Sequence, residues 1–161
     1  MGAFDPERIL RVLARRRVRY ILVGAMAARL QGFPRLTADA DISPAGGAAN
    51  LKRLAQALDD LNARSYAESE PQGLAFNCDA GSLARANVWN LTTDAGRLDV
   101  IFNPVGTGGY RDLARSAVPF EVFGLEIRAA SLGDILRSKR ASHRPQDQQD
   151  AILISQMLSR G

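Results

Sequence analysis

The chain has 161 residues, a length that suits one domain, and we expect residues 1–161 to form a single globular unit with a buried core. Its 46% hydrophobic and 24% charged residues are ordinary for such a unit, and a formal charge of +4 is compatible with nucleotide or RNA binding without requiring it. A single cysteine, Cys78, excludes an internal disulfide, and a single histidine, His143, excludes a histidine-rich zinc site. The N-terminus lacks a signal-peptide pattern, and no apolar run approaches the about 20 residues that span a bilayer, so we expect a cytoplasmic protein with no membrane partner.

The first half of the chain alternates between helical and extended patterns. Asp5 and Pro6 are typical of a helix start. Leucines three and four residues apart predict a longer helix in the middle of this half. The expected elements, in order, are a helix from Pro6, a strand over 18–23, a short helix after Gly24, a strand over 38–43 and a helix over 48–62.

The second half contains two predicted hairpins and two predicted helices at its end. Residues 64–71 are poorly patterned. The strand-forming stretches 87–93 and 97–103 flank Asp94-Ala95-Gly96, which is typical of a hairpin turn. The remaining elements are a short helix over 110–116, a hairpin over 118–128 that turns at Gly124, a helix over 132–143 capped by Ser131 and a last helix from Pro145. Together these elements predict an α/β (α+β) fold, in which helices flank a mixed sheet and two helices form a C-terminal pair.

The stretch 21–43 is the most informative part of the chain. An apolar strand ends at Gly24, and a short helix of small residues follows. Glycine lets a backbone approach a phosphate closely, and a helix that begins there offers free N–H groups and the positive end of its dipole. No Gly-Lys-Ser/Thr sequence follows, so this is not a Walker loop.

Asp39 and Asp41 occur one residue apart in the second predicted strand. Because side chains alternate along a strand, both carboxylates face the same side, about 6–7 Å apart along the chain. Two carboxylates in this arrangement can converge on a hard divalent ion such as Mg²⁺. Alone, an Asp-x-Asp segment is also typical of a solvated loop or a helix cap, so the surrounding residues decide its meaning.

The residues around this pair resemble the signature of the nucleotidyltransferase superfamily with the DNA polymerase β-like catalytic core. That signature is an apolar strand, a Gly-Gly or Gly-Ser pair that opens a helix, and an Asp-x-Asp or Asp-x-Glu strand. The nearer resemblance is to small stand-alone bacterial members, including the AbiEii-like toxin nucleotidyltransferases. The matching positions are Gly24, Ala27, Gly32, Arg35, Thr37, Asp39 and Asp41. The chain departs from the pattern at Ala25, where a second glycine or a serine is usual.

A third acid completes the constellation that the resemblance implies. Asp99 stands alone in the apolar strand Leu98–Ile101, where a charge is costly unless it is paired or bound to metal. Its neighbours Leu98 and Val100 are expected to face the core. The rival candidate is Asp94, but it falls in the predicted turn, where aspartate is common.

The resemblance implies a nucleotidyltransferase that moves a nucleoside monophosphate from a nucleoside triphosphate to a hydroxyl or phosphate of RNA, a protein or a small molecule. It implies Mg²⁺ as the cofactor, with Mn²⁺ as an alternative. It also implies a role in a toxin–antitoxin system, and that the chain acts with a protein partner or as a homo-oligomer. It implies that Asp39, Asp41 and Asp99 are the catalytic and metal-binding residues. The implied nucleotide-binding residues are Gly24, Ala25, Arg35, Thr37 and Lys139. For Arg35 and Thr37, contact with phosphate and stiffening of the loop both stay open.

The C-terminal segment also resembles the small members, which often carry a lysine followed by Arg-Pro-Lys-Asp. Here Lys139 precedes Arg144-Pro145-Gln146-Asp147, so Gln146 replaces the second lysine. We expect Asp147 and Asp150 to hold the last two helices together and His143 to lie at the surface.

Two other functions fit parts of the pattern. The departures at Ala25 and Gln146 are compatible with an inactive, antitoxin-like binding module on the same fold. A haloacid-dehalogenase-like phosphatase also uses Asp-x-Asp. That class places its acids at the end of a strongly apolar first strand, whereas Arg35–Ala38 precedes them here.

Overall fold

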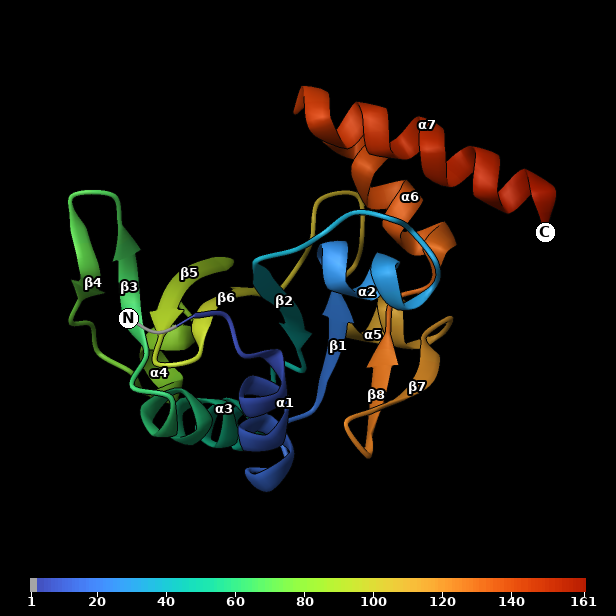
Figure 1. Cartoon of the computed structure of the whole chain (residues 1–161). Helices are drawn as coiled ribbons and strands as arrows, with labels where there is room; N and C mark the ends of the chain where they lie inside the picture. The colour runs from blue at the N-terminus through green and yellow to red at the C-terminus, as the bar shows by residue number, and fades with distance from the viewer. Residues whose placement is uncertain (1–2) are drawn as a thin grey trace.

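The computed structural model describes residues 3–161 and is built around an eight-stranded mixed sheet (Figure 1). The strands are β1 (Tyr20–Val23), β2 (Asp39–Pro44), β3 (Arg64–Ala67), β4 (Glu70–Leu74), β5 (Val88–Thr93), β6 (Gly96–Ile101), β7 (Val118–Val122) and β8 (Leu125–Ala129). The helices are α1 (Pro6–Arg15), α2 (Gly24–Leu30), α3 (Ala48–Asp60), α4 (Ala80–Leu83), α5 (Tyr110–Ala114), α6 (Leu132–Ala141) and α7 (Pro145–Arg160).

The strand order β4-β3-β5-β6-β2-β1-β8-β7 places β1 and β2 in the middle of the sheet. These two strands are antiparallel, and each has a parallel neighbour on its outer side, β8 beside β1 and β6 beside β2. The hairpins β3–β4 and β7–β8 form the two ends of the sheet (Figure 1). The β2–β6 register puts Asp41 directly beside Asp99, and Asp39 beside Arg97.

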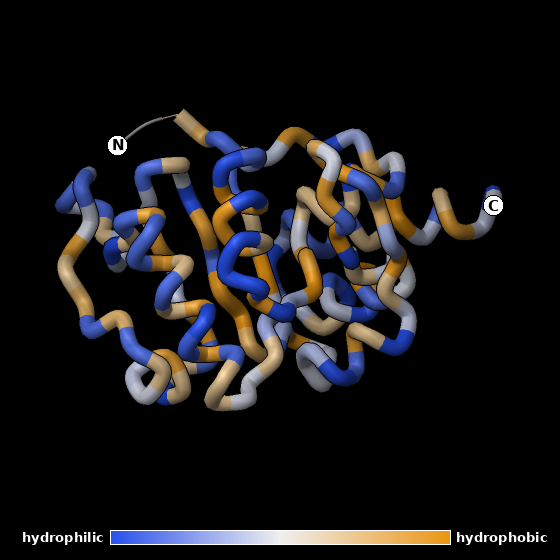
Figure 2. The backbone as a smooth tube through the Cα atoms, turned by 90° about the horizontal axis from the view of Figure 1, so that it is seen from below, coloured by the Kyte–Doolittle hydropathy of each residue, from blue (hydrophilic) through white to orange (hydrophobic). Residues whose placement is uncertain are grey.

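The core fills the space between the sheet and the helices α1 and α3, and it continues into buried residues of α2, α5, α6 and α7. Ala40, Ile42, Leu98 and Val100, which alternate with the acids of β2 and β6, are fully buried. The inner side of α1 buries Ile9, and its arginines point outward, so the helix separates the two kinds of side chain. Figure 2, seen from below, shows hydrophobic and hydrophilic stretches alternating along the tube, as amphipathic elements on one core require.

The C-terminal helices α6 and α7 pack on each other at the end of the sheet where β1 runs into α2 (Figure 1). The predicted caps are present, since Ser131 accepts a hydrogen bond from the Asp134 amide at the start of α6 and Pro145 opens α7. Among the apolar residues of α7, Ile154 is fully buried, whereas Ile152 is 61% exposed and Leu158 is 43% exposed. Only part of this helix therefore has a neighbour to pack against. Among the described residues, none of the helices combines the length and apolarity that a bilayer-spanning segment requires.

The structure confirms both predicted hairpins and the α/β class. It differs over residues 64–74, which form β3 and β4 at the edge of the sheet although the sequence shows no strand pattern there. The reason is that an edge hairpin buries little: across β4 only Gly73 is buried, so no apolar alternation is needed. Residues 80–83, for which no element was predicted, form the short helix α4.

A buried side chain joins the first turn of α3 to the ends of β1 and β2. Asn50 is 4% exposed, accepts a hydrogen bond from the Arg19 amide (2.8 Å) and donates to the carbonyls of Arg19 (2.9 Å) and Ala45 (2.8 Å). All of its amide group is thus used to pin the helix to two central strands. Removing the side chain would leave three backbone groups without a hydrogen-bond partner and away from water.

We therefore predict that Asn50→Ala lowers the free energy of unfolding by roughly 2–4 kcal/mol, because buried unpaired groups carry their full desolvation cost. Asn77→Ala, in an exposed loop position, is the matched control and should change stability by less than about 0.5 kcal/mol. Urea titration of both variants measures the difference. Equal midpoints for the two variants would show that the Asn50 contacts contribute nothing.

Candidate active site

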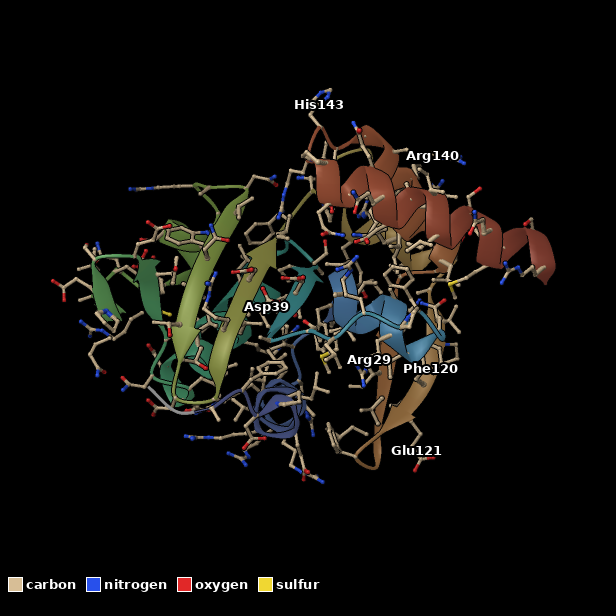
Figure 3. All side chains as sticks on the ribbon, turned by 45° about the horizontal axis from the view of Figure 1, so that its top comes forward. Arg29, Asp39, Phe120, Glu121, Arg140 and His143 are labelled. Atoms are coloured by element: carbon tan, nitrogen blue, oxygen red, sulfur yellow. The ribbon has the colours of Figure 1, made fainter. Side chains whose placement is uncertain are left out.

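Three carboxylates meet on the face of the sheet opposite α1 and α3. Asp39 and Asp41 come from β2 and Asp99 comes from the neighbouring strand β6. One oxygen from each lies within 4.8 Å of the other two. Figure 3 shows Asp39 in the middle of the molecule, between the strands β5 and β6 and the helix α2. The structure thus brings together the three acids predicted from the sequence.

Gly24 fits against this cluster. It has φ +71°, a left-handed conformation that favours glycine, and its Cα lies against the Asp41 carboxylate. A Cβ built on Gly24 would overlap Asp41 Oδ2. The β1–β2 register explains the contact, because it places Val23, the residue before Gly24, beside Asp41. The glycine is therefore required both by the backbone turn and by the space that the carboxylate occupies.

The cluster is electrostatically strained. Burial, reinforced by the charges of Asp39 and Asp99, raises the pKa of Asp41 to about 8. Burial also raises the pKa of Asp99, although the guanidinium of Arg97 opposes that change. Arg97 Nη2 lies 3.2 Å from Asp99 Oδ1. One arginine does not neutralise three acids, so the group attracts further positive charge.

These residues fit a divalent metal ion. Hard cations such as Mg²⁺ and Mn²⁺ prefer carboxylate oxygens, and three such oxygens within reach of one another can bind one. The raised pKa of Asp41 supports this assignment, because a bound cation would relieve the repulsion that raises it.

A cavity of about 320 Å³ opens beside Asp39 and Asp41 and extends to the C-terminal helices. Its floor includes Gly24 and Ala25, at the start of α2, so the predicted turn does face the space next to the acids. The opposite walls come from the loop after β6 and from α6 and α7. They include Ile101, Pro104, Val105, Thr107, Ser138, Lys139, Ser142, Arg144 and Gln146.

Two predicted cationic residues line this cavity, but both are paired with acids of α7. Arg35 forms an ion pair with Asp150, which is only 1% exposed. Lys139 Nζ lies 3.0 Å from Asp150 Oδ2 and 3.2 Å from Asp147 Oδ1. Burial raises the pKa of Asp150, but hydrogen bonds from Lys139, Arg35 and Gln146 outweigh it and leave the pKa below its usual value. Asp147 and Asp150 thus join the last two helices as expected, and Asp150 also ties them to the loop before β2.

Thr37 has a structural role in this arrangement. Its hydroxyl donates to the carbonyl of Asp39 (2.7 Å) and lies 3.1 Å from Asp39 Oδ1. The side chain lines a second hollow together with Met26 and Leu36 and is not among the residues that line the cavity. Of the two roles left open by the sequence, the contacts favour stiffening of the loop that carries Asp39.

The remaining candidates lie outside the cluster. Asp94 is in the β5–β6 turn, 3.8 Å from Arg8, so the structure groups Asp99 and not Asp94 with the pair on β2. His143 is exposed and points away from the molecule at its upper edge in Figure 3.

Two residues beside the cluster, Arg97 and Tyr66, were not identified from the sequence. Arg97 could have been found, because it lies two positions before Asp99 and shares its face of the strand. Tyr66 could not be found in the same way, because the strand β3 that carries it was not predicted from the sequence.

No protein-family model matches the sequence. No curated protein matches it either. Solved structures do share its fold. The lincosamide antibiotic adenylyltransferase LnuA, solved with lincomycin bound, is 17% identical with a TM-score of 0.60, over 96% of this chain and 98% of LnuA. The antibiotic-resistance factor ANT(2'')-Ia is 16% identical with a TM-score of 0.57, over 95% of this chain and 82% of that one.

A third structure, a candidate nucleotidyltransferase from Thermotoga maritima, is 16% identical with a TM-score of 0.53, over 98% of this chain and 96% of its own. Identities this low establish the fold and not the activity. The chain therefore has the nucleotidyltransferase fold that the sequence resemblance predicted. The AbiEii-like subtype stays a prediction.

We predict that Gly24→Ala displaces the Asp41 carboxylate and weakens Mn²⁺ binding at least tenfold, because the new methyl group and the carboxylate cannot share the same space. Gly47→Ala is the matched control, since nothing lies within 4 Å of its added Cβ. Calorimetric titration with Mn²⁺ compares the two variants. Unchanged affinity in Gly24→Ala would contradict the close fit of glycine and carboxylate.

A second prediction concerns pH. A metal ion must displace the proton that Asp41, with its pKa of about 8, retains at lower pH. The apparent Mn²⁺ affinity should therefore rise by up to about tenfold per pH unit as the pH approaches 8 from below, and level off above it. Asp94→Asn should leave this profile unchanged. An affinity that does not vary between about pH 6 and 8 would show that the Asp41 carboxyl is already ionised without metal.

Proposed function

We propose that the protein is a metal-dependent nucleotidyltransferase that transfers a nucleoside monophosphate from a nucleoside triphosphate to an acceptor. The observation that carries the proposal is the convergence of Asp39, Asp41 and Asp99, of which Asp39 and Asp41 line a cavity together with Gly24. The fold shared with LnuA, a lincosamide antibiotic adenylyltransferase, and with the antibiotic-resistance factor ANT(2'')-Ia supports it.

The donor nucleotide would occupy the cavity between α2 and the C-terminal helices. Its phosphates would lie against the backbone of Gly24 and Ala25, where Ala25 still allows close approach. Arg35 Nε, which is buried and has no hydrogen-bond partner among the described residues, provides one donor near this wall. The nucleoside would lie against the apolar part of the wall, including Val105, which is 55% exposed.

The three carboxylates would have different roles in the reaction. Asp39 and Asp41 would hold divalent cations, with Asp99 completing the site, and the bound metal would supply charge neutralisation at the transferring phosphate. Asp99, whose pKa is raised by burial, would accept the proton of the attacking hydroxyl. Thr37 would keep Asp39 oriented.

The contacts of Lys139 and Arg35 with Asp147 and Asp150 favour a second function, the inactive binding module. Cations that are already paired contribute less to phosphate binding. In that function the fold would act through a protein partner, as an antitoxin-like component would.

We predict that the protein releases pyrophosphate from at least one nucleoside triphosphate when Mg²⁺ and cellular RNA or hydroxylated small molecules are supplied. Asp39→Asn should reduce the rate at least 100-fold without lowering the melting temperature, because it removes a metal ligand and keeps the shape of the side chain. Asp94→Asn is the control and should retain full activity. Equal rates for Asp39→Asn and the unaltered protein would refute the catalytic role of Asp39. An unaltered protein that is folded but releases no pyrophosphate would favour the binding module.

A further inference from the structure

A second hollow lies apart from the cavity that the proposed reaction would use. Its volume is about 440 Å³, and it shares no lining residue with the cavity. Four segments that are distant in the sequence meet there: the chain before α1, the helix α2, the loop before β2 and the β7–β8 turn. Of the residues that line it, all but Arg29 and Thr37 are apolar.

The hollow leaves large apolar side chains in contact with water. Leu36, in the loop before β2, is 79% exposed, and Phe123, in the β7–β8 turn, is 43% exposed. Single exposed apolar residues are common on protein surfaces, but here two of them line one apolar hollow. Such a surface gains free energy when another apolar group covers it.

Phe123 also has a backbone conformation that suits it poorly. With Gly124 it forms the two-residue turn between β7 and β8, and both residues have positive φ, +53° and +76°. Turns of this kind favour asparagine followed by glycine, and positive φ is rare for a bulky residue. Arg11 Nη2 donates to the carbonyl of Phe123 (3.0 Å) and holds the turn in place. An exposed ring at a position that favours a small polar residue points to a role in binding.

One arginine at the hollow has no carboxylate partner. No acid is among the lining residues. Within residues 3–161, Arg29 forms no ion pair, and its guanidinium makes one long hydrogen bond, to the carbonyl of Arg35 (3.5 Å). Arg11, which contacts the Phe123 carbonyl, is already paired with Glu7 (2.8 Å). In Figure 3 Arg29 lies between α2 and the β7–β8 turn. Charge complementarity therefore favours an occupant that brings a carboxylate to Arg29.

The loop before β2 borders both the hollow and the candidate active site. Leu36 and Thr37 line the hollow, whereas Arg35 and Asp39 line the cavity. The Thr37 hydroxyl donates to the carbonyl of Asp39 (2.7 Å). A segment bound in the hollow would therefore lie against the residue that orients Asp39.

We propose that the hollow binds a segment of a partner protein in which leucine or phenylalanine stands next to aspartate or glutamate. The apolar side chain would pack against Leu36 and Phe123, and the carboxylate would pair with Arg29. The inference goes beyond the proposed transferase function and does not depend on it. A protein segment fits better than a small ligand, because small-ligand sites enclose most of the ligand, whereas Leu36 stands out into solvent.

Fluorescence anisotropy with the labelled peptide Glu-Glu-Leu-Phe-Glu-Glu tests the binding on the full chain, and it needs neither metal nor nucleotide. We expect Leu36→Ala, Phe123→Asn and Arg29→Gln each to weaken binding at least about fivefold. The peptides Lys-Lys-Leu-Phe-Lys-Lys and Glu-Glu-Ser-Ser-Glu-Glu should bind at least about tenfold more weakly, because the first lacks the carboxylates and the second lacks the apolar side chains.

The chain offers matched controls for these variants. Leu158→Ala removes an apolar side chain as exposed as that of Phe123, and Arg115→Gln removes an exposed arginine just after α5. Both variants should bind the peptide as the unaltered protein does. Phe123→Asn suits the turn, so it removes the ring without straining the backbone. Thermal melting of every variant verifies that it is folded.

Three results would overturn the proposal. The first is a folded protein that does not bind the acidic apolar peptide. The second is peptide binding that the variants at Leu36, Phe123 and Arg29 lower no more than the controls do. The third is displacement of the peptide by decanoate, a small apolar carboxylate, at a lower concentration than the unlabelled peptide requires, which would assign the hollow to a small ligand.

Discussion

The repulsion among three carboxylates is the constraint on which the site depends. With oxygens within 4.8 Å of one another, each pair of charges would cost roughly 3–4 kcal/mol at an effective dielectric constant of about 20. The parallel pairing of β2 with β6 makes the encounter unavoidable, since it sets Asp41 level with Asp99. Burial of Asp41 adds to the cost, and its pKa of about 8 expresses both effects. A bound cation would offset the repulsion among the three carboxylates that the fold holds together.

The surrounding elements are consistent with that constraint. Gly24 leaves room for the Asp41 carboxylate and begins a helix beside it. Thr37 fixes Asp39, and Arg97 fixes Asp99, so two of the three acids have a dedicated partner. Further away, Asp150 connects the loop before β2 to α6 and α7 through Arg35 and Lys139. The C-terminal helices are thereby held over the cavity, and any ligand that recruits Arg35 or Lys139 must compete with buried acids for them.

Much of this could be read from the sequence because it is local. The cap at Asp5, the turn at Gly24, the alternation of Leu98, Asp99 and Val100 and the start of α6 at Ser131 each depend on residues close together in the chain. Asp99 could be chosen because a charge in an apolar strand is rare without a partner, whereas Asp39 and Asp41 could be chosen only from the residues around them. The resemblance to nucleotidyltransferases grouped the three acids into one site before the pairing of β2 with β6 was known.

The rest depends on distant contacts that no local pattern carries. The hairpin β3–β4 buries little, so its sequence shows no strand alternation, and Tyr66 could not be placed beside Arg97. The outer side of α7 contains Ile152 and Leu158, which a helical pattern assigns to the core although both are exposed. That Asp150 pairs with both Arg35 and Lys139 depends on how α7 crosses the loop before β2, which is a matter of tertiary packing.

The central claim is that the three acids and the cavity beside them form one magnesium-dependent nucleotide site. Calorimetric titration of each nucleoside triphosphate, with and without Mg²⁺, tests it most directly, in the unaltered protein and in the Asp39→Asn, Asp41→Asn double variant. The account predicts binding of at least one nucleotide that requires Mg²⁺ and disappears in the double variant while its melting temperature is retained. Binding that persists in the double variant, or that needs no Mg²⁺, would contradict it.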